Sequence, residues 1–211
     1  MRHLKRLDKP QILEEKHIWT EKFIESGKKR PSSKQYDHEK IKEELAKISL
    51  NKCFYTEVLF SDLSEAQVDH YIEVAEDKNK TFEWENLYLA HEKSNVGKSS
   101  NKAIPNLETL DPFIDYDDEI EKHIFFVDNN VRGLTEKGIK TIQKYNLNKG
   151  IFNGLRATEL IKFYKVWVAI GENKSNRDFT DLEKQTLKSF AQPDAPFSLM
   201  FRLILKQHSL L

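Results

Sequence analysis

The sequence predicts an α+β protein in which a small strand–loop–strand–helix unit is embedded in a mainly α-helical single domain. Short runs rich in aromatic and β-branched residues, typical of strands, occur between residues 53 and 91. The flanking segments carry apolar residues at intervals of three and four, typical of amphipathic helices. We therefore expect a helical, basic arm over residues 1–52, the mixed unit over residues 53–110, and an acidic linker with a helical C-terminal region over residues 111–211.

Two helices are expected in the arm. Apolar residues at helical intervals predict one helix over residues 10–26 and a second, highly charged one over residues 36–50. Gly27 and the proline-containing stretch after it separate the two helices. The basic cluster of residues 28–30 lies in this break. It fits either a solvated loop or a contact with nucleic acid.

Strands are expected in the middle of the chain. Aromatic and β-branched composition predicts strands over residues 53–56, 67–72 and 87–91. A helix should start near Ser94, whose hydroxyl could cap its first turn. The stretch over residues 104–118, rich in Pro and Asp, is expected to be a boundary or a wrapped loop.

The C-terminal third is expected to be helical. Periodicity predicts a helix over residues 134–145, a long helix that ends at Gly171, and two more helices over residues 178–190 and 196–206. The last of these contains a nearly continuous apolar run, which fits either the core or a face that binds a partner.

Charge is unevenly distributed although the formal net charge is zero. Lys and Arg outnumber Asp and Glu by 14 to 9 in residues 1–52 and by 13 to 7 in residues 136–211, whereas acidic residues prevail by 11 to 5 in residues 53–110. An acidic middle suits cation capture and basic ends suit a polyanion, although such blocks also occur as solvated helix faces.

Composition also bounds the location of the protein. No apolar run approaches the roughly 20 residues of a membrane span, and the basic residues near the start are not followed by an apolar stretch. We therefore expect a cytoplasmic protein without membrane contact. The single cysteine, Cys53, excludes an internal disulfide framework.

Candidate site residues lie in and after the second predicted strand. Phosphodiester hydrolysis needs a cation to bear charge on the phosphate and a base to deprotonate water. The Asp69 carboxylate can bind Mg²⁺, and the neighbouring His70 imidazole has a suitable pKa for the base. Asn95, in the first turn of the predicted helix, offers a neutral oxygen. Taken singly, each residue also fits a structural role.

The spacing of these residues resembles a known family. Val-Asp-His, a loop, then Asn-Leu-x-Leu-x-x-x-x-x-Asn and a trailing Gly-Lys are similar to the HNH endonucleases, which have a ββα-metal fold. The resemblance spans residues 53 to about 102 and implies that Asp69 and Asn95 bind Mg²⁺ or Mn²⁺. It further implies that His70 is the general base and that Asn86 holds the loop so that His70 points correctly.

The resemblance also suggests residues around this centre. Lys98 would lie near the phosphate. On residue type alone, Lys93 and Lys98 fit either a phosphate contact or plain helix surface, and His91 fits either packing or an accessory contact with metal or phosphate. Many relatives carry two Cys-x-x-Cys zinc knuckles, but the four positions here are Cys53, Thr56, His91 and Ser94. We therefore expect no structural zinc site.

A weaker likeness extends over almost the whole chain. The HNH component of the Septu anti-phage system and its retron-borne relatives are similar to segments at residues 1–3, 53–57, 110–112, 140–148, 155–156 and 195–198. This implies an antiviral defence nuclease that works with an ABC-type ATPase partner. DNA is the expected substrate. RNA, including structured RNA, is the alternative within the enzyme class, and an interaction subunit with a decayed nuclease fold is the alternative outside it.

Overall fold

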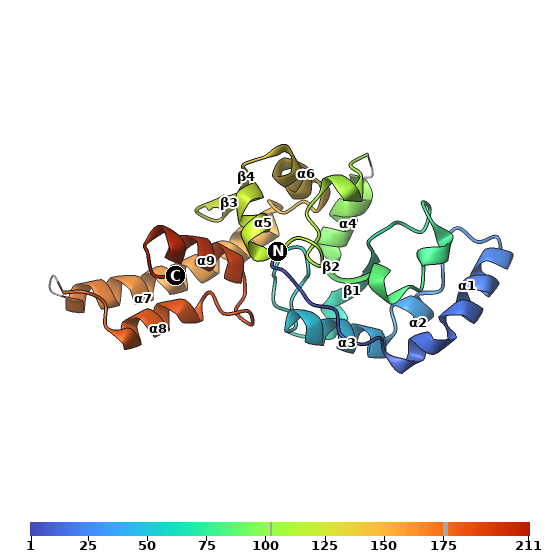
Figure 1. Cartoon of the computed structure of the whole chain (residues 1–211), viewed down its shortest axis with the longest axis horizontal. Helices are drawn as coiled ribbons and strands as arrows, with labels where there is room; N and C mark the ends of the chain where they lie inside the picture. The colour runs from blue at the N-terminus through green and yellow to red at the C-terminus, as the bar shows by residue number, and fades with distance from the viewer. Residues whose placement is uncertain (102, 175–176) are drawn as a thin grey trace.

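The computed structural model describes residues 1–101, 103–174 and 177–211, and it confirms a mixed α+β chain. Helices predominate in the described residues, whose strands pair into two antiparallel two-stranded sheets. Figure 1 shows an elongated molecule with the N-terminal arm at one end and the last three helices at the other. The first sheet lies between these ends, beside the arm.

The two helices expected in the arm are present, and a short third helix lies between them. The first predicted helix begins as a 3₁₀ turn and continues as an α-helix, and the second begins three residues later than expected. In order, the elements are η1 (Gln11–Glu15), α1 (Lys16–Glu25), α2 (Ser33–Tyr36) and α3 (Glu39–Ser49). Helix α3 buries Ile41 and Leu45 completely, which fixes the arm against the first sheet.

The central unit runs strand, loop, strand, helix. Strand β1 (Ala66–His70) pairs antiparallel with β2 (Leu87–His91), and helix α4 (Glu92–Ser100) follows β2 without a linker. The loop between the strands contains two 3₁₀ turns, η3 (Lys78–Lys80) and η4 (Trp84–Asn86).

The strand predicted over residues 53–56 is wrong. These residues form a turn, closed by a hydrogen bond from the Glu57 amide to the Cys53 carbonyl at 3.0 Å. Phe54 and Tyr55 are buried, and the Phe54 amide donates a hydrogen bond to the Leu89 carbonyl of the sheet. Aromatic composition here reflects burial, because core turns need apolar side chains as much as strands do.

The start of helix α4 also differs from expectation. The helix begins at Glu92, and its cap is His91, whose Nδ1 accepts a hydrogen bond from the Lys93 amide at 3.1 Å. Ser94 lies inside the first turn and donates its hydroxyl to the Tyr145 carbonyl instead. The chain turns into the helix directly at the strand end, so the cap falls three residues before Ser94.

Residues 106–133, which include the predicted acidic linker, contain a helix and a β-hairpin. The elements are the 3₁₀ turn η5 (Asn106–Glu108), helix α5 (Asp117–His123) and the strands β3 (Ile124–Val127) and β4 (Asn130–Gly133). This second sheet was not predicted. Its turn places Asp128 at a φ of 51°, a left-handed conformation that Asp tolerates well in tight hairpins.

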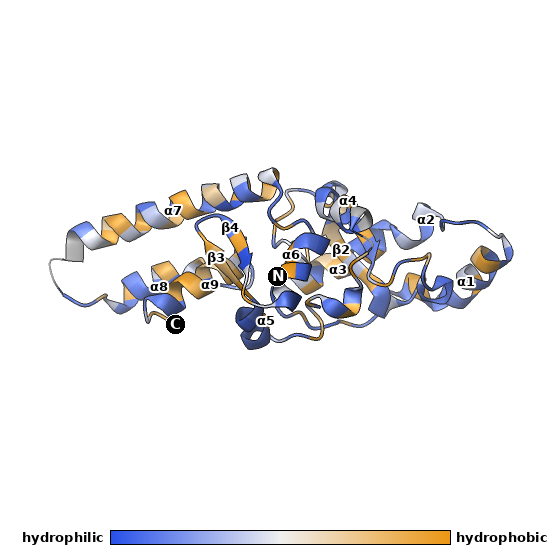
Figure 2. Cartoon of the chain, turned by 90° about the horizontal axis from the view of Figure 1, so that it is seen from above, coloured by the Kyte–Doolittle hydropathy of each residue, from blue (hydrophilic) through white to orange (hydrophobic). Residues whose placement is uncertain are grey.

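Four helices complete the described chain: α6 (Glu136–Lys144), α7 (Gly150–Lys174), α8 (Asp181–Ser189) and α9 (Ser198–Gln207). Helix α7 continues through Gly171, so the predicted end there is wrong. A glycine inside an exposed helix costs only about 1 kcal/mol, which its neighbours offset. Figure 2 shows α7 running alongside α8 and α9, with apolar residues between them.

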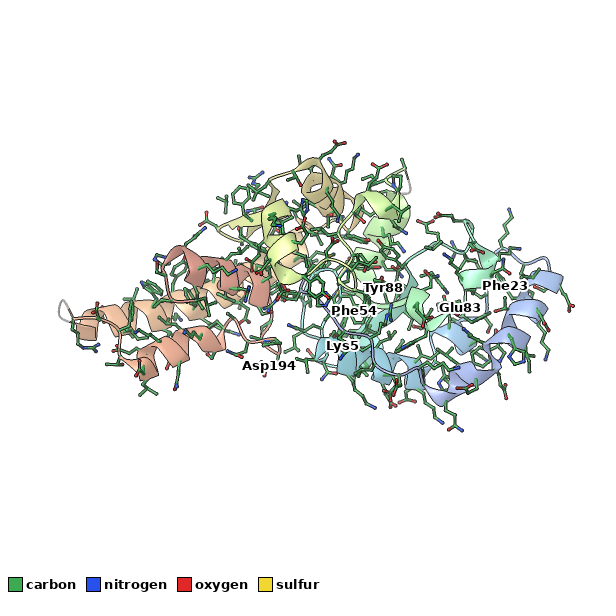
Figure 3. All side chains as sticks on the ribbon, viewed as in Figure 1. Lys5, Phe23, Phe54, Glu83, Tyr88 and Asp194 are labelled. Carbon is green, nitrogen blue, oxygen red and sulfur yellow. The ribbon has the colours of Figure 1, made fainter. Side chains whose placement is uncertain are left out.

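The apolar run in α9 belongs to the core. Leu199, Met200, Phe201 and Leu205 are fully buried, and Phe201 packs against Phe163 of α7 with ring centroids 5.1 Å apart. Nearer the first sheet, aromatic side chains fill the centre, where Figure 3 labels Phe54 and Tyr88. Within the described ranges, no helix combines the length and the apolar character needed to cross a membrane.

Candidate active site beside strand β1

A pocket of about 260 Å³ lies beside the end of strand β1. It brings together four of the predicted site residues: Asp69, His70, Asn95 and Lys98. The arm and the loop after β1 complete its walls with Lys29, Arg30, Pro31, Tyr36, Val68, Glu73, Val74 and Ala75. Residues that are far apart in the sequence therefore meet around one concave site.

Asp69 is the buried anionic centre of this pocket, with 6% of its surface exposed. Both of its carboxylate oxygens accept hydrogen bonds from Lys98 Nζ, at 3.0 and 2.9 Å. The Tyr55 hydroxyl donates a further bond to Oδ2 at 2.7 Å. Lys98 also donates to the His70 carbonyl. Lys98 is thus an internal counter-cation of the carboxylate.

The His70 ring is held by its backbone surroundings. Its Nε2 lies 2.9 Å from the Thr81 carbonyl, which can only accept, so Nε2 carries the proton and Nδ1 is the basic nitrogen. The Tyr36 ring leans on the imidazole, with centroids 4.6 Å apart. Burial lowers the pKa of His70, although Asp69 and the Thr81 carbonyl oppose this effect. The imidazole is therefore neutral at neutral pH.

Asn86 lies one layer behind His70. Its Oδ1 accepts from the Ile72 amide at 2.7 Å, while its Nδ2 donates to the carbonyls of Ile72 and Lys80 at 3.1 and 2.9 Å. These bonds tie Asn86, at the end of the loop after β1, to the start and the middle of that loop. Because Lys80 directly precedes Thr81, Asn86 also fixes the carbonyl that orients His70. Asn86 thus supports the imidazole indirectly and touches no pocket atom itself.

Asp69 and Asn95 are the residues that could hold a metal. Asn95 donates its Nδ2 to Gln67 Oε1 at 3.0 Å, which leaves the amide oxygen as its remaining ligand atom. In the parts of the chain that the structure describes, no three His, Cys, Asp or Glu side chains converge on one point. One carboxylate and one amide oxygen fit Mg²⁺, which keeps several waters. Binding would require Asp69 to exchange or share its contact with Lys98.

The structure does not bring Lys93 and His91 into the pocket. Lys93 pairs with Glu92 at 3.2 Å on the surface of α4. His91 caps the helix and lies against Phe60 and Phe152, with ring centroids 6.3 and 5.4 Å away.

The four positions that correspond to zinc ligands are engaged in protein contacts. The Cys53 Sγ accepts from the His91 amide at 3.3 Å, and Thr56 Oγ1 accepts from the Val58 amide. His91 and Ser94 are committed to the cap and to the Tyr145 carbonyl. Protein hydrogen bonds and aromatic packing brace this part of the fold.

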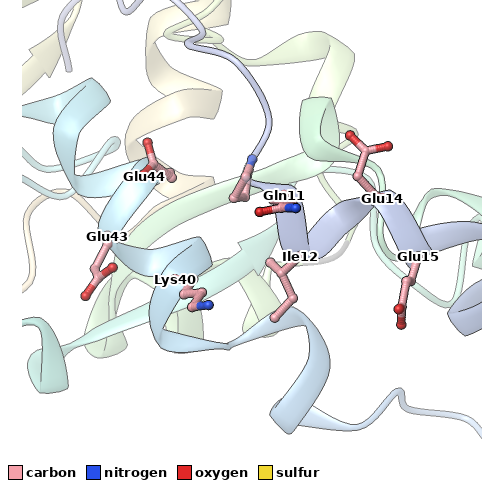
Figure 4. A pocket seen from close by; sticks show the side chains of 8 residues that line it. Gln11, Ile12, Glu14, Glu15, Lys40, Glu43 and Glu44 are labelled. Atoms are coloured by element: carbon pink, nitrogen blue, oxygen red, sulfur yellow. The ribbon is translucent and has the colours of Figure 1, made fainter.

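A larger concavity of about 570 Å³ lies elsewhere, between η1 and α3. Figure 4 shows that carboxylates dominate its labelled side chains: Glu14, Glu15, Glu43 and Glu44. None of the predicted site residues lines it. This surface holds none of the residues of the Val-Asp-His motif, so the smaller pocket beside β1, which holds Asp69 and His70, is the candidate site.

Sequence reasoning missed several residues that build the pocket. Tyr55 holds Asp69, and its ring stacks on Tyr145 at 4.0 Å. Tyr36 packs on His70, and Asp37 accepts a hydrogen bond from the Val68 amide at 2.8 Å. The arm residues are more than 30 positions away in the sequence, so only the tertiary fold reveals their role.

No model of a known protein family matches the chain, and no curated protein is significantly similar to it.

Proposed function

We propose that this protein is a metal-dependent HNH endonuclease with a ββα-metal active site formed by β1, β2 and α4. One observation carries the proposal. A neutral imidazole, fixed at Nε2 by the Thr81 carbonyl, lines the same pocket as Asp69 and Asn95. A base beside two hard oxygen ligands is the minimal equipment for metal-assisted hydrolysis of a phosphodiester.

The residues divide the chemistry between them. His70 Nδ1 accepts a proton from water as the water oxygen bonds to phosphorus and the bond from phosphorus to the leaving oxygen breaks. Asp69 and Asn95 hold the cation, and Asn86 keeps the His70 ring in position. A bound Mg²⁺ or Mn²⁺ supplies positive charge to the phosphate and the leaving oxygen. Burial favours the neutral imidazole, which is the form that can take a proton.

DNA is the proposed substrate, in the setting of an anti-phage complex with an ABC-type ATPase. Support comes from the motif over residues 68–98 and from the weaker likeness of the outer segments to the Septu component. RNA with the same backbone chemistry is the alternative substrate.

The test is cleavage of plasmid DNA and of total RNA with Mg²⁺ or Mn²⁺, with and without an ABC-type ATPase of the proposed kind. His70→Ala should lower the rate by about 10² to 10⁴, the usual contribution of a general base. EDTA should abolish cleavage. Full activity of the His70→Ala variant would refute the proposed role of His70 and with it the proposed function.

A second candidate is an interaction subunit that keeps the fold without the reaction. The specific observation in its favour is the occupation of both Asp69 oxygens by Lys98. This candidate predicts stable association with the ATPase, no cleavage of either nucleic acid, and no Mn²⁺ binding that depends on Asp69. Isothermal titration of Mn²⁺ into wild type and Asp69→Asn separates the two candidates.

A further inference from the structure

We infer that Arg30, with Lys29 beside it, binds the phosphodiester backbone of the nucleic-acid strand whose phosphate enters the pocket. This inference rests on the proposed function and deepens it, because it assigns a substrate-binding role to the arm. The resembled motif begins at Val68 and contains no residue of the arm. The fold places these two cations in the lining of the same pocket as Asp69 and His70.

The arm is joined directly to the catalytic strand. Asp37 Oδ1 accepts from the Val68 amide at 2.8 Å, one residue before Asp69, and Lys42 pairs with the same carboxylate at 3.1 Å. Tyr36 covers the His70 ring. The segment that carries Arg30 is therefore anchored only a few residues downstream, at the site itself.

The other end of the segment is anchored as well. Phe23 and Trp19 of α1 pack edge-on against the buried Phe82, with centroids 6.4 and 5.6 Å away. Lys78 in η3 donates to the Lys28 carbonyl at 3.0 Å. Figure 1 shows α1 and α2 beside the loop that follows β1. The loop with Lys29 and Arg30 is thus held beside the pocket by contacts on both sides of the segment.

The basic residues in and near the pocket differ in whether their charge is already paired. Lys98 forms an ion pair with Asp69. Lys144, which is buried nearby, donates to the Ile104 carbonyl. In contrast, Lys29 and Arg30 are exposed and form no ion pair or side-chain hydrogen bond with the described residues. Among the basic residues that line the pocket, these two have the charge available for an incoming anion.

A phosphodiester is the anion that fits this arrangement. A guanidinium can donate two parallel bonds to one phosphate, and such contacts position a strand without reading its bases. Arg30 faces the pocket from the arm while His70 and Asp69 lie on the strand side. A strand held between them would present one phosphate to the base and a neighbouring phosphate to the arm.

Binding of fluorescein-labelled DNA duplex, and of RNA of the same sequence, tests the inference. Fluorescence anisotropy in EDTA measures affinity without cleavage, over a series of salt concentrations. Arg30→Gln should weaken binding roughly tenfold at low salt. It should also reduce the slope of log K against log salt by about 0.9, the value for one phosphate contact with B-DNA.

Lys28→Gln is the matched control, because Lys28 is an exposed cation of the same loop that does not line the pocket. It should change the affinity and the slope much less than Arg30→Gln. Equal effects of the two variants, unchanged binding by Arg30→Gln, or absence of binding by the wild type would each overturn the inference. An Arg30-dependent slope with RNA alone supports it and makes RNA the substrate.

Failure of this inference is distinguishable from failure of the proposed function. If His70→Ala stops cleavage while Arg30→Gln leaves binding intact, the proposed nuclease activity is supported and the proposed role of the arm is refuted. If the chain binds nucleic acid through Arg30 but never cleaves it, the role of Arg30 in binding is supported and the proposed nuclease activity is refuted.

Discussion

The ammonium group of Lys98 lies 3.0 and 2.9 Å from the two carboxylate oxygens of Asp69, and both side chains are almost fully buried. A cation thus already balances the charge of the carboxylate that we propose as a metal ligand. Lys98 would have to move or share Asp69 before Mg²⁺ could bind. Metal affinity and resting stability are therefore coupled through one lysine.

Replacing that lysine should shift the balance in a measurable way. Lys98→Met leaves a buried carboxylate unpaired, so the free energy of unfolding without metal should fall by about 3 kcal/mol. Mn²⁺ should bind more tightly and raise the melting temperature more than in the wild type. Lys93→Met, on the exposed face of the same helix, is the control and should change neither quantity. Weaker Mn²⁺ binding by Lys98→Met would contradict the proposed competition.

The lowered pKa of His70 sets the pH dependence of cleavage. Burial disfavours the charged imidazole, so the neutral base persists below its ordinary pKa of 6.5. Activity should fall on the acidic side, and the midpoint of this limb in kcat/KM should lie below pH 6.5. An acidic limb centred above pH 6.5 would count against His70 as the base.

Tyr36 should affect the midpoint of the acidic limb of the pH profile, because its ring covers the His70 imidazole. Tyr36→Ala admits water to His70, so the pKa should rise back toward 6.5 and the acidic limb should move to higher pH. Tyr164→Ala, at an exposed position of α7, should leave the limb unmoved. A uniform loss of rate at every pH, with no displacement of the limb, would show that Tyr36 does not act through the imidazole.

Asn86 should matter for both stability and rate. Its amide makes three hydrogen bonds to the backbone of Ile72 and Lys80. Asn86→Ala should lower the free energy of unfolding by about 1 to 3 kcal/mol, because buried backbone groups lose their partners, and cleavage should slow as His70 loses its support. Urea denaturation and cleavage assays measure the two effects. Asn79→Ala, at an exposed position of the same loop, should affect neither.

Glu57 should make stability depend on acid. Although burial opposes ionisation, the Met1 ammonium and Lys52 hold the pKa of this carboxyl down to about 2, against an ordinary 4.5. A depressed pKa contributes stability that is complete above about pH 4.5 and is lost as pH falls toward 2. The loss should be on the order of 3 kcal/mol by urea denaturation. Glu57→Gln, which cannot ionise, should be less stable at pH 7 and should lose less on acidification.

Sequence patterns predicted those elements whose signal is local. Leu87–His91 is a strand with the expected bounds, because an apolar run of this short length is typical of a buried strand. The same kind of composition gave a wrong strand prediction at residues 53–56, where the apolar side chains belong to a buried turn. The hairpin of β3 and β4 had a readable signal, an apolar run followed by Asp128 and Asn129, but its acidic surroundings favoured a loop.

The site could be predicted only as far as its motif extends. Asp69, His70, Asn95 and Lys98 line one pocket because they lie on a strand and the helix packed beside it. Lys93, two residues after the cap, points elsewhere, since the helical period of 3.6 places it on another face than Lys98. The contributions of Arg30, Tyr36 and Tyr55 come from tertiary packing, which no local pattern encodes.

The hydrogen bond from the Val68 amide to Asp37 ties the central unit of residues 53–110 to the arm. The edge of the catalytic strand is completed by a side chain from the arm, and the His70 ring leans on the residue next to it. Residues 53–110 are therefore not a transferable cassette. Grafted onto another scaffold without residues 28–45, they would expose a bare strand edge and an unsupported imidazole, and the graft would need a substitute for the arm.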